Sequence, residues 1–238
     1  GDVTQGGVTS NVATFRVDRR INLTVAEVGG TATQTVGGAS GQVTTFTVTN
    51  SSNAPLDFGL QGVQTGVTAP FAGTDNFDVT DITFAIDTNG NGVYDVGTDS
   101  IVTYLDEVAA DATRTVFLIA NVPAGRANGD VAAVQLPAIA QEGGTAATQG
   151  GLVTQTAGAD NPNAVDTVFA DAAGATGTVG DAARDGRATA RDQYNVVAAA
   201  IALEKQAIVI SDPFNGTTNP KAIPGAVIEY CLIARNSG

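Results

Sequence analysis

Oxygen-bearing side chains recur at alternate positions in the stretch DTNGNGVYDVGTD, which runs from Asp87 to Asp99. Counted from Asp87 as the first position, Asn or Asp stands at the third, fifth and ninth positions and glycine at the sixth, as in an EF-hand calcium loop. In such a loop alternate oxygens converge on a hard cation, and the glycine permits the sharp turn. The candidate calcium ligands are Asp87, Asn89, Asn91, the Val93 carbonyl, Asp95 and Asp99.

The stretch departs from an EF-hand in two ways. Thr98 stands where a bidentate Glu belongs, and the flanking segments ITFAI and SIVTYL alternate as strands do. A plain β-turn is the alternative, because Asn-Gly twice over is a strong hairpin signal. We favour a structural calcium ion held in a hairpin, with a dissociation constant on the order of 0.1 to 1 mM, as in extracellular modules.

Other acidic residues form weaker patterns. The stretch GADNPNAVD, with Asp160, Asn161, Asn163 and Asp166, fits an Asx-turn loop better than any metal template. A carboxylate-only hydrolase would need two acids about 5 to 9 Å apart beside a sugar cleft, and the candidate acids are Asp75, Asp78, Asp81, Asp106 and Glu107. With aromatic residues at 5%, such a cleft is not expected, and we predict that the protein is not an enzyme.

The composition excludes several functions. The chain has no histidine and a single cysteine, Cys231, so it has no Ser-His or Cys-His pair and no imidazole zinc site. Its net charge of −13 repels nucleic acid and anionic lipid. The sequence contains no run of about 18 apolar residues, which is the length that would predict a membrane-spanning helix. The abundance of Thr, Val, Ala and Gly and the scarcity of Lys favour a secreted, extracellular or cell-surface β-protein.

Apolar and polar residues alternate along most of the chain, which predicts an all-β fold, an immunoglobulin-like or Greek-key β-sandwich. Turns rich in Gly, Asn and Pro separate the alternating segments. A long loop at residues 157–191 is expected to contain one strand fragment, VDTVFA, and a short helix near Asp181 to Arg184. The expected strands are 11–17, 21–28, 42–50, 77–87, 114–122 and 130–140.

An internal repeat divides the chain. INLTVAEV at Ile21 precedes an alternating strand that ends at Asn50, and IALEKQAIV at Ile201 precedes another that ends at Asn236. Each pair follows a segment typical of a closing strand. We therefore expect a closing or donor strand at residues 1–20, a sandwich domain at 21–199 with the calcium-like hairpin at 87–99, and the opening strands of a second domain at 200–238.

The segment KAIPGAVIEYCLIARNSG, from Lys221 to Gly238, resembles the start of the surface-protein repeat known as domain of unknown function eleven. Pro224, Gly225, Tyr230, Asn236 and Gly238 occupy that family's pattern, and the match covers the last 38 residues. The resemblance implies immunoglobulin-like domains in bacterial and archaeal adhesins, envelope proteins and fibres, with no catalytic residues. The family's strand normally lacks a cysteine, so Cys231 is expected beside a core or paired with a cysteine outside this sequence.

A chain that opens with a closing strand and ends with opening strands has complementary exposed edges. We expect a structural subunit of an extracellular filament, a homopolymer assembled head to tail by donor-strand complementation. Later strands of a longer chain could instead complete the second domain, and an adhesin or ligand-binding surface domain is the alternative function. The expected donor residues are Asn11, Val12, Ala13, Thr14, Phe15, Arg16 and Val17, and the acceptor residues are Val227, Ile228, Tyr230, Leu232 and Ala234.

Overall fold

The structure is a computed structural model that describes residues 15–198 and 201–236. Every regular element in this part of the chain is a β-strand. The strands are β1 (Arg19–Ile21), β2 (Leu23–Glu27), β3 (Thr33–Thr35), β4 (Gln42–Asn50), β5 (Leu56–Leu60), β6 (Thr80–Ile86), β7 (Ser100–Val102), β8 (Tyr104–Val108), β9 (Thr113–Asn121), β10 (Val131–Glu142), β11 (Thr167–Phe169), β12 (Arg187–Val196), β13 (Ile201–Ser211) and β14 (Val227–Asn236).

Two five-stranded sheets form a β-sandwich, which confirms the predicted fold class. One sheet has the order β2-β4-β9-β6-β7 and the other β3-β12-β10-β5-β8. Alternate side chains from both sheets meet in a single core, with Phe46 and Leu118 from the first sheet and Phe58, Leu136 and Tyr194 from the second. Tyr194 is fully buried, and its hydroxyl lies 3.3 Å from the carbonyl oxygens of Gln42 and Leu118, so it ties the two sheets together.

Strand β10 is buried on both faces over most of its length. The opposite sheet covers one face, and residues from the connections 61–79 and 170–186 bind the other. Gln135 exchanges hydrogen bonds with the backbone of Val179, and the Asp75 carboxylate accepts one from the backbone N–H of Ala133. These two connections are therefore held against the sheet.

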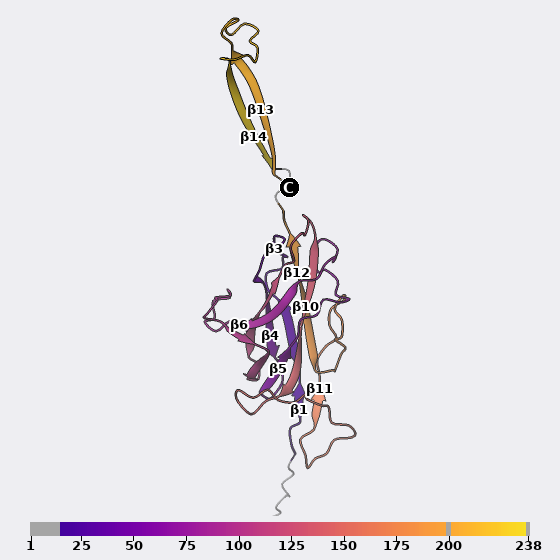
Figure 1. Cartoon of the computed structure of the whole chain (residues 1–238). Coiled ribbons are helices and arrows are strands. Elements are labelled where there is room, and N and C mark those ends of the chain that lie inside the picture. Colours follow the sequence, from indigo (N-terminus) through magenta and orange to yellow (C-terminus); the bar gives the residue numbers. More distant parts are fainter. Residues whose placement is uncertain (1–14, 199–200, 237–238) are drawn as a thin grey trace, which may run out of the picture.

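The ends of the sandwich carry two smaller structures (Figure 1). At one end β1 pairs in parallel with β11. At the other end, beyond β12, the antiparallel hairpin β13–β14 projects away from the body of the molecule. Residues 15–18, which precede β1, lie at the end opposite to this hairpin (Figure 1).

Several predicted segments agree with the structure and others need correction. The strand predicted at 42–50 is β4 with the same bounds, and VDTVFA contains β11. No helix forms at Asp181 to Arg184, where the chain turns instead. Strand β12 begins at Arg187, inside the predicted long loop, because its pairing with β10 continues to Arg187 opposite Ile139.

The predicted donor strand lies only partly within the described residues and stays a prediction. Asn11, Val12, Ala13 and Thr14 lie outside the described residues. Phe15, Arg16 and Val17 belong to no strand, and regular structure begins at Arg19. Arg19 and Arg20 lie in β1, which pairs with β11 of the same chain in a separate two-stranded sheet.

Candidate functional site

The calcium-like stretch connects β6 to β7, which pair antiparallel, so the loop is carried by a hairpin as predicted. Asp87 lies at its start and accepts hydrogen bonds from the backbone N–H groups of Gly90, Asn91 and Gly92 at 2.6, 3.2 and 2.8 Å. Gly90 and Gly92 adopt φ values of 74° and 76°. Glycine adopts this left-handed conformation without strain, which allows the chain to wrap around the Asp87 carboxylate.

Three further predicted ligands converge at the same loop. One carboxylate oxygen of Asp95 accepts hydrogen bonds from the side-chain amides of Asn89 and Asn91, at 2.9 and 2.6 Å. These two bonds, that from Asn89 foremost, lower the pKa of Asp95. The amide oxygens of Asn89 and Asn91 accept from the backbone of Asn91 and Val93. The donor set is made of oxygen atoms of the kind that calcium prefers.

Asp99 lies beneath the loop rather than on its rim. It is buried, and its two carboxylate oxygens accept from the backbone N–H groups of Thr88 and Asp95 at 2.9 and 2.7 Å. The carboxylate thus joins the two ends of the loop. The Val93 side chain is exposed.

Long-range folding assembles an acidic cluster that the sequence pattern did not reveal. Carboxylate oxygens of Asp18, Asp160 and Asp166 lie within 4.8 Å of one another. Asp18 precedes β1 and is distant in sequence from Asp160 and Asp166. The spacing of residues along the chain therefore could not predict that Asp18 joins them. The predicted Asx-turn is present, because Asn161 accepts from the backbone N–H of Asn163, and Asp166 accepts from that of Asn161.

Several of the remaining candidate acids hold loops in place. Asp106 accepts from the backbone N–H of Ala147, and Glu107 from those of Gly144 and Thr145. Asp81 accepts from the side-chain amide of Asn121. In the described residues these carboxylates therefore have backbone or amide donors as partners.

The hairpin β13–β14 presents one apolar face to solvent. Residues paired across an antiparallel hairpin share a face, so Leu203, Ala207 and Val209 of β13 lie on the same side as the predicted acceptor residues Ala234, Leu232, Tyr230 and Ile228 of β14. Leu232 is 72% exposed and Leu203 74% exposed. Lys205, which pairs with Leu232, lies on the same side, with its Nζ 4.2 Å from the centre of the Tyr230 ring. We call the seven apolar residues the apolar hairpin face. Val227 is exposed too, beyond a register shift near the hairpin tip.

The internal repeat relates the apolar hairpin face to a face of the strands in the sandwich. In the sandwich, Asn50 at the end of β4 pairs with Leu23 at the start of β2, and Asn236 at the end of β14 pairs with Ile201 at the start of β13. With the two Asn residues aligned, Leu232 corresponds to Phe46, which is fully buried. The apolar hairpin face is therefore the counterpart of a core face.

Cys231 lies on the other side of the hairpin, opposite Gln206, and is exposed. Cys231 is thus exposed in the single chain, and the expectation that it lies beside a core or pairs with a cysteine outside this sequence stays a prediction. The β13 residues of the apolar hairpin face were missed among the predicted acceptor residues. Their alternation in IALEKQAIV was the signal that could have found them.

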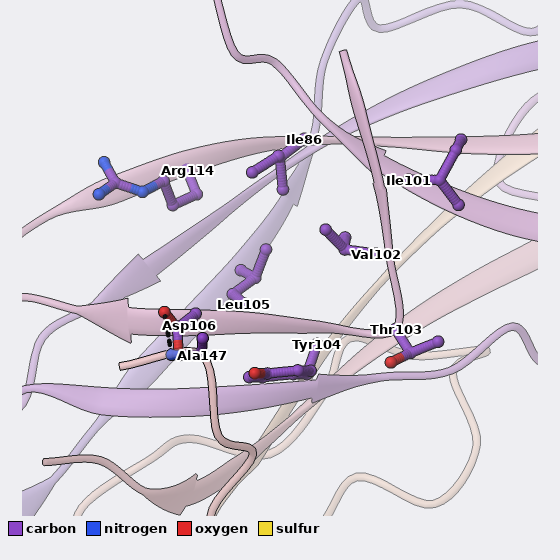
Figure 2. A pocket seen from close by; sticks show the side chains of 9 residues that line it. All are labelled: Ile86, Ile101, Val102, Thr103, Tyr104, Leu105, Asp106, Arg114 and Ala147. Atoms are coloured by element: carbon purple, nitrogen blue, oxygen red, sulfur yellow. Dashed lines mark hydrogen bonds between the residues drawn. The ribbon is translucent and has the colours of Figure 1, made fainter. Parts of the chain in front are cut away.

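A groove opens between the edge strands of the two sheets. The chain leaves β7, the edge of one sheet, and enters β8, the edge of the other, through Thr103. Figure 2 shows Ile86, Val102 and Leu105 around the floor of this groove, with Tyr104 along one side. Its volume is about 610 Å³, and its remaining lining residues are Ile101, Thr103, Asp106, Arg114 and Ala147. We call it the edge groove.

No family model matches the chain, and no curated protein matches its sequence. Among solved structures, the chain is similar to the CupB6 tip adhesin of Pseudomonas aeruginosa, with 14% identity and a TM-score of 0.23. The similarity covers 60% of this chain and 47% of the adhesin chain, so this chain spans about half of that structure. A structural similarity with so low a TM-score gives no information about the function of this chain. No helix among the described residues is long and apolar enough to cross a membrane.

Proposed function

We propose that this chain is a structural subunit of an extracellular filament or surface fibre, joined head to tail by β-strand complementation. The observation that carries the proposal is the apolar hairpin face. An isolated two-stranded hairpin is marginally stable in water. Covering side chains such as Leu203, Tyr230 and Leu232 would contribute about 1.5 to 3 kcal/mol each. A strand that covers the apolar hairpin face would therefore stabilise the hairpin.

The sandwich suggests what such a strand looks like. Strand β12 covers the inner face of β2 and β4, where Tyr194 reaches the backbone of Gln42. Along the sequence, β12 leads into the opening strand β13, as residues 11–17 lead into β1 and β2. By this correspondence, residues 11–17 of one subunit are the donor that covers the apolar hairpin face of the next.

Side chains at the described end of this donor are free for the role. Phe15 is 84% exposed and Val17 70% exposed. They are two residues apart, so in a strand they point to one side. The donor end and the hairpin lie at opposite ends of the molecule (Figure 1). A contact between two different surfaces is heterologous, and unless it closes a ring it propagates a filament.

Calcium in the 87–99 loop is part of the same proposal, with a structural role. Asp87, Asn89, Asn91 and Asp95 would supply side-chain oxygens, and Val93 a carbonyl oxygen. Asp99 would hold the loop closed through the backbone of Thr88 and Asp95. Extracellular calcium concentrations suit sites of 10⁻⁴ to 10⁻³ M affinity, which agrees with a secreted location.

Deletion of residues 1–17 tests the assembly. We expect the wild-type chain to form high-mass assemblies by light scattering and negative-stain imaging, and the truncated chain to remain monomeric with a hairpin newly sensitive to protease. Assemblies that form equally well without residues 1–17 would show that this segment is not the donor. Adding a synthetic peptide of residues 8–17 to the truncated chain should restore protection of the hairpin.

A further inference from the structure

Three segments of the chain have the pattern of an asparagine followed, two residues later, by Ser or Thr. In secreted proteins this tripeptide is the acceptor for N-linked saccharides, which are bulky and lie in solvent. The sequence presents the three tripeptides as equivalent, but the structure distinguishes them by exposure. They are Asn22-Leu23-Thr24, Asn50-Ser51-Ser52 and Asn215-Gly216-Thr217.

The two tripeptides of the sandwich are poor acceptors. Asn50 is fully buried, and its side-chain amide donates to the carbonyl oxygens of Ala54 and Val108. A saccharide on this nitrogen would remove one of these bonds and would have to fit into the core. Asn22 is half-buried, and the next residue, Leu23, lies in the core with 1% of its surface exposed. The folded sandwich therefore does not present either tripeptide to an enzyme.

The third tripeptide lies in the loop at residues 212–226, which joins β13 to β14. This loop is at the end of the hairpin that points away from the sandwich (Figure 1). Asn215, Gly216 and Thr217 are all exposed. Gly216 has a φ of 61°, and a Cβ placed on it would have no atom within 4 Å. The space around this tripeptide is therefore open to an enzyme and to an attached saccharide.

Asp212 holds this loop in place and leaves part of the Asn215 amide free. Its carboxylate accepts hydrogen bonds from the backbone N–H groups of Phe214, Asn215 and Lys221, at 2.8, 2.6 and 2.6 Å. It also accepts one from the side-chain amide of Asn215 at 3.0 Å. An amide nitrogen has two N–H groups. In the part of the chain that the structure describes, Asp212 is the acceptor for one of them and the other has no acceptor.

We propose that Asn215 is the acceptor for an N-linked saccharide, which an enzyme transfers from a lipid-linked saccharide phosphate. The amide nitrogen forms a bond to the anomeric carbon of the saccharide and releases one proton. The bond from that carbon to the phosphate oxygen breaks, and its electron pair stays with the phosphate. The product retains one N–H, which keeps the hydrogen bond to Asp212. This proposal rests on the secreted location in the proposed function.

A saccharide at Asn215 is compatible with strand complementation. The residues of the apolar hairpin face nearest to the loop are Val209 and Ile228, which pair with each other, and Asn215 lies beyond them. A donor strand on that face would therefore not meet the saccharide. Phe214, the neighbour of Asn215, is 85% exposed. A solvated saccharide beside this ring would shield it from water and from other chains.

Peptide mapping of the protein that the producing cells export tests the modification. Trypsin cuts after Lys205 and Lys221, so residues 206–221 form one peptide that contains Asn215. We expect this peptide to carry a saccharide, which fragmentation in the mass spectrometer places on Asn215. Thr217→Ala should lower the modified fraction at least about tenfold, because it removes the hydroxyl residue of the tripeptide. Thr218→Ala, one residue beyond the tripeptide, is the matched control and should keep the saccharide.

Three results would overturn the assignment. They are an unmodified 206–221 peptide in the exported protein, a saccharide that persists in Asn215→Gln, and equal losses in Thr217→Ala and Thr218→Ala. Deletion of residues 1–17 tests the proposed function separately. A modified chain that never assembles would leave the saccharide site standing and refute the filament. Assemblies of unmodified subunits would do the reverse, and a chain that is not exported would count against both.

Discussion

Buried polar side chains decide much of the local geometry of this sandwich. Asn50 is fully buried at the end of β4, where its amide donates to the carbonyl oxygens of Ala54 and Val108 at 2.9 and 2.8 Å. Its own side-chain oxygen accepts from the backbone N–H of Ser52 at 3.0 Å. The repeat has an Asn followed by Ser at Asn50 and again at Asn236. In the first domain, Asn50 forms a buried link between strand ends.

We predict that Asn50→Ala lowers the free energy of unfolding by about 3 kcal/mol, because it leaves buried backbone groups without partners. Chemical denaturation at neutral pH measures the change. Asn163→Ala, at an exposed loop position, is the matched control and should stay within about 0.5 kcal/mol of wild type. A similar small effect at Asn50 would show that water replaces the lost bonds.

Asp192 is the residue with the clearest pH dependence. Burial raises the pKa of its carboxyl to about 7, and the nearby charge of Glu27 acts in the same direction, whereas the hydrogen bond from the Gln193 backbone lowers it. In the unfolded chain the carboxyl has its ordinary pKa near 4. Between about pH 4 and 7 the folded protein keeps a proton that the unfolded chain releases, so stability falls as pH rises through this window.

Replacing the carboxyl by an amide should remove this dependence. We predict that Asp192→Asn gains stability relative to wild type as pH rises from 4 to 8, by at most about 4 kcal/mol for a shift of about three pKa units. Thermal or urea unfolding at several pH values, at constant ionic strength, gives the two curves. Parallel curves across this range would mean that Asp192 does not titrate differently on folding.

At the scale of elements, the β6–β7 hairpin links the calcium-like loop to the edge groove. Ile86 precedes Asp87, and Ile101 and Val102 follow Asp99 within three residues, so the loop and the groove share their supporting strands. A cation that fixes the loop would also fix the position of β7. Among the described strands, β7 pairs with β6 alone, so its position depends on the loop that joins the two.

We predict that 10 mM calcium raises the melting temperature by roughly 3 to 10 °C relative to excess chelator, from the mass-action gain at 10 to 100 times the dissociation constant. Asp95→Asn should abolish the shift, because it removes a charged ligand without changing side-chain size. Asp78→Asn, at an exposed position, is the control and should keep it. Identical melting curves with calcium and with chelator would argue against a metal role.

At the scale of the whole molecule, the hairpin is the part that the sandwich does not stabilise. Its two strands pair with each other over ten positions, and in the described part of the chain no other strand joins their sheet. On β14, Leu232 and Ala234 of its apolar face correspond to Phe46 and Val48, which are buried in the first domain. A neighbouring copy or later strands of a longer chain would satisfy the same surface, and assembly measurements distinguish the two.

Charge placed on either face of β14 provides a sharp test of assembly. We predict that Leu232→Asp reduces the mass of assemblies to that of the monomer, because the carboxylate would have to be buried under the donor strand. Cys231→Asp, one residue away on the opposite face, should leave assembly within twofold of wild type. Equal effects at the two positions would mean that the apolar face is not the one covered.

The sequence by itself determined the all-β class, the bounds of β4, and the hairpin that carries the calcium-like loop, but it missed strands such as β3 and β5. These features follow from local alternation and turn residues, which depend on neighbours only a few positions away. Only the tertiary structure decided that β12 begins at Arg187, that Asp18 meets Asp160 and Asp166, and that the edge groove forms between β7 and β8. Alternation shows which side chains share a face of a strand, but it does not show which distant strand, connection or second chain will cover that face.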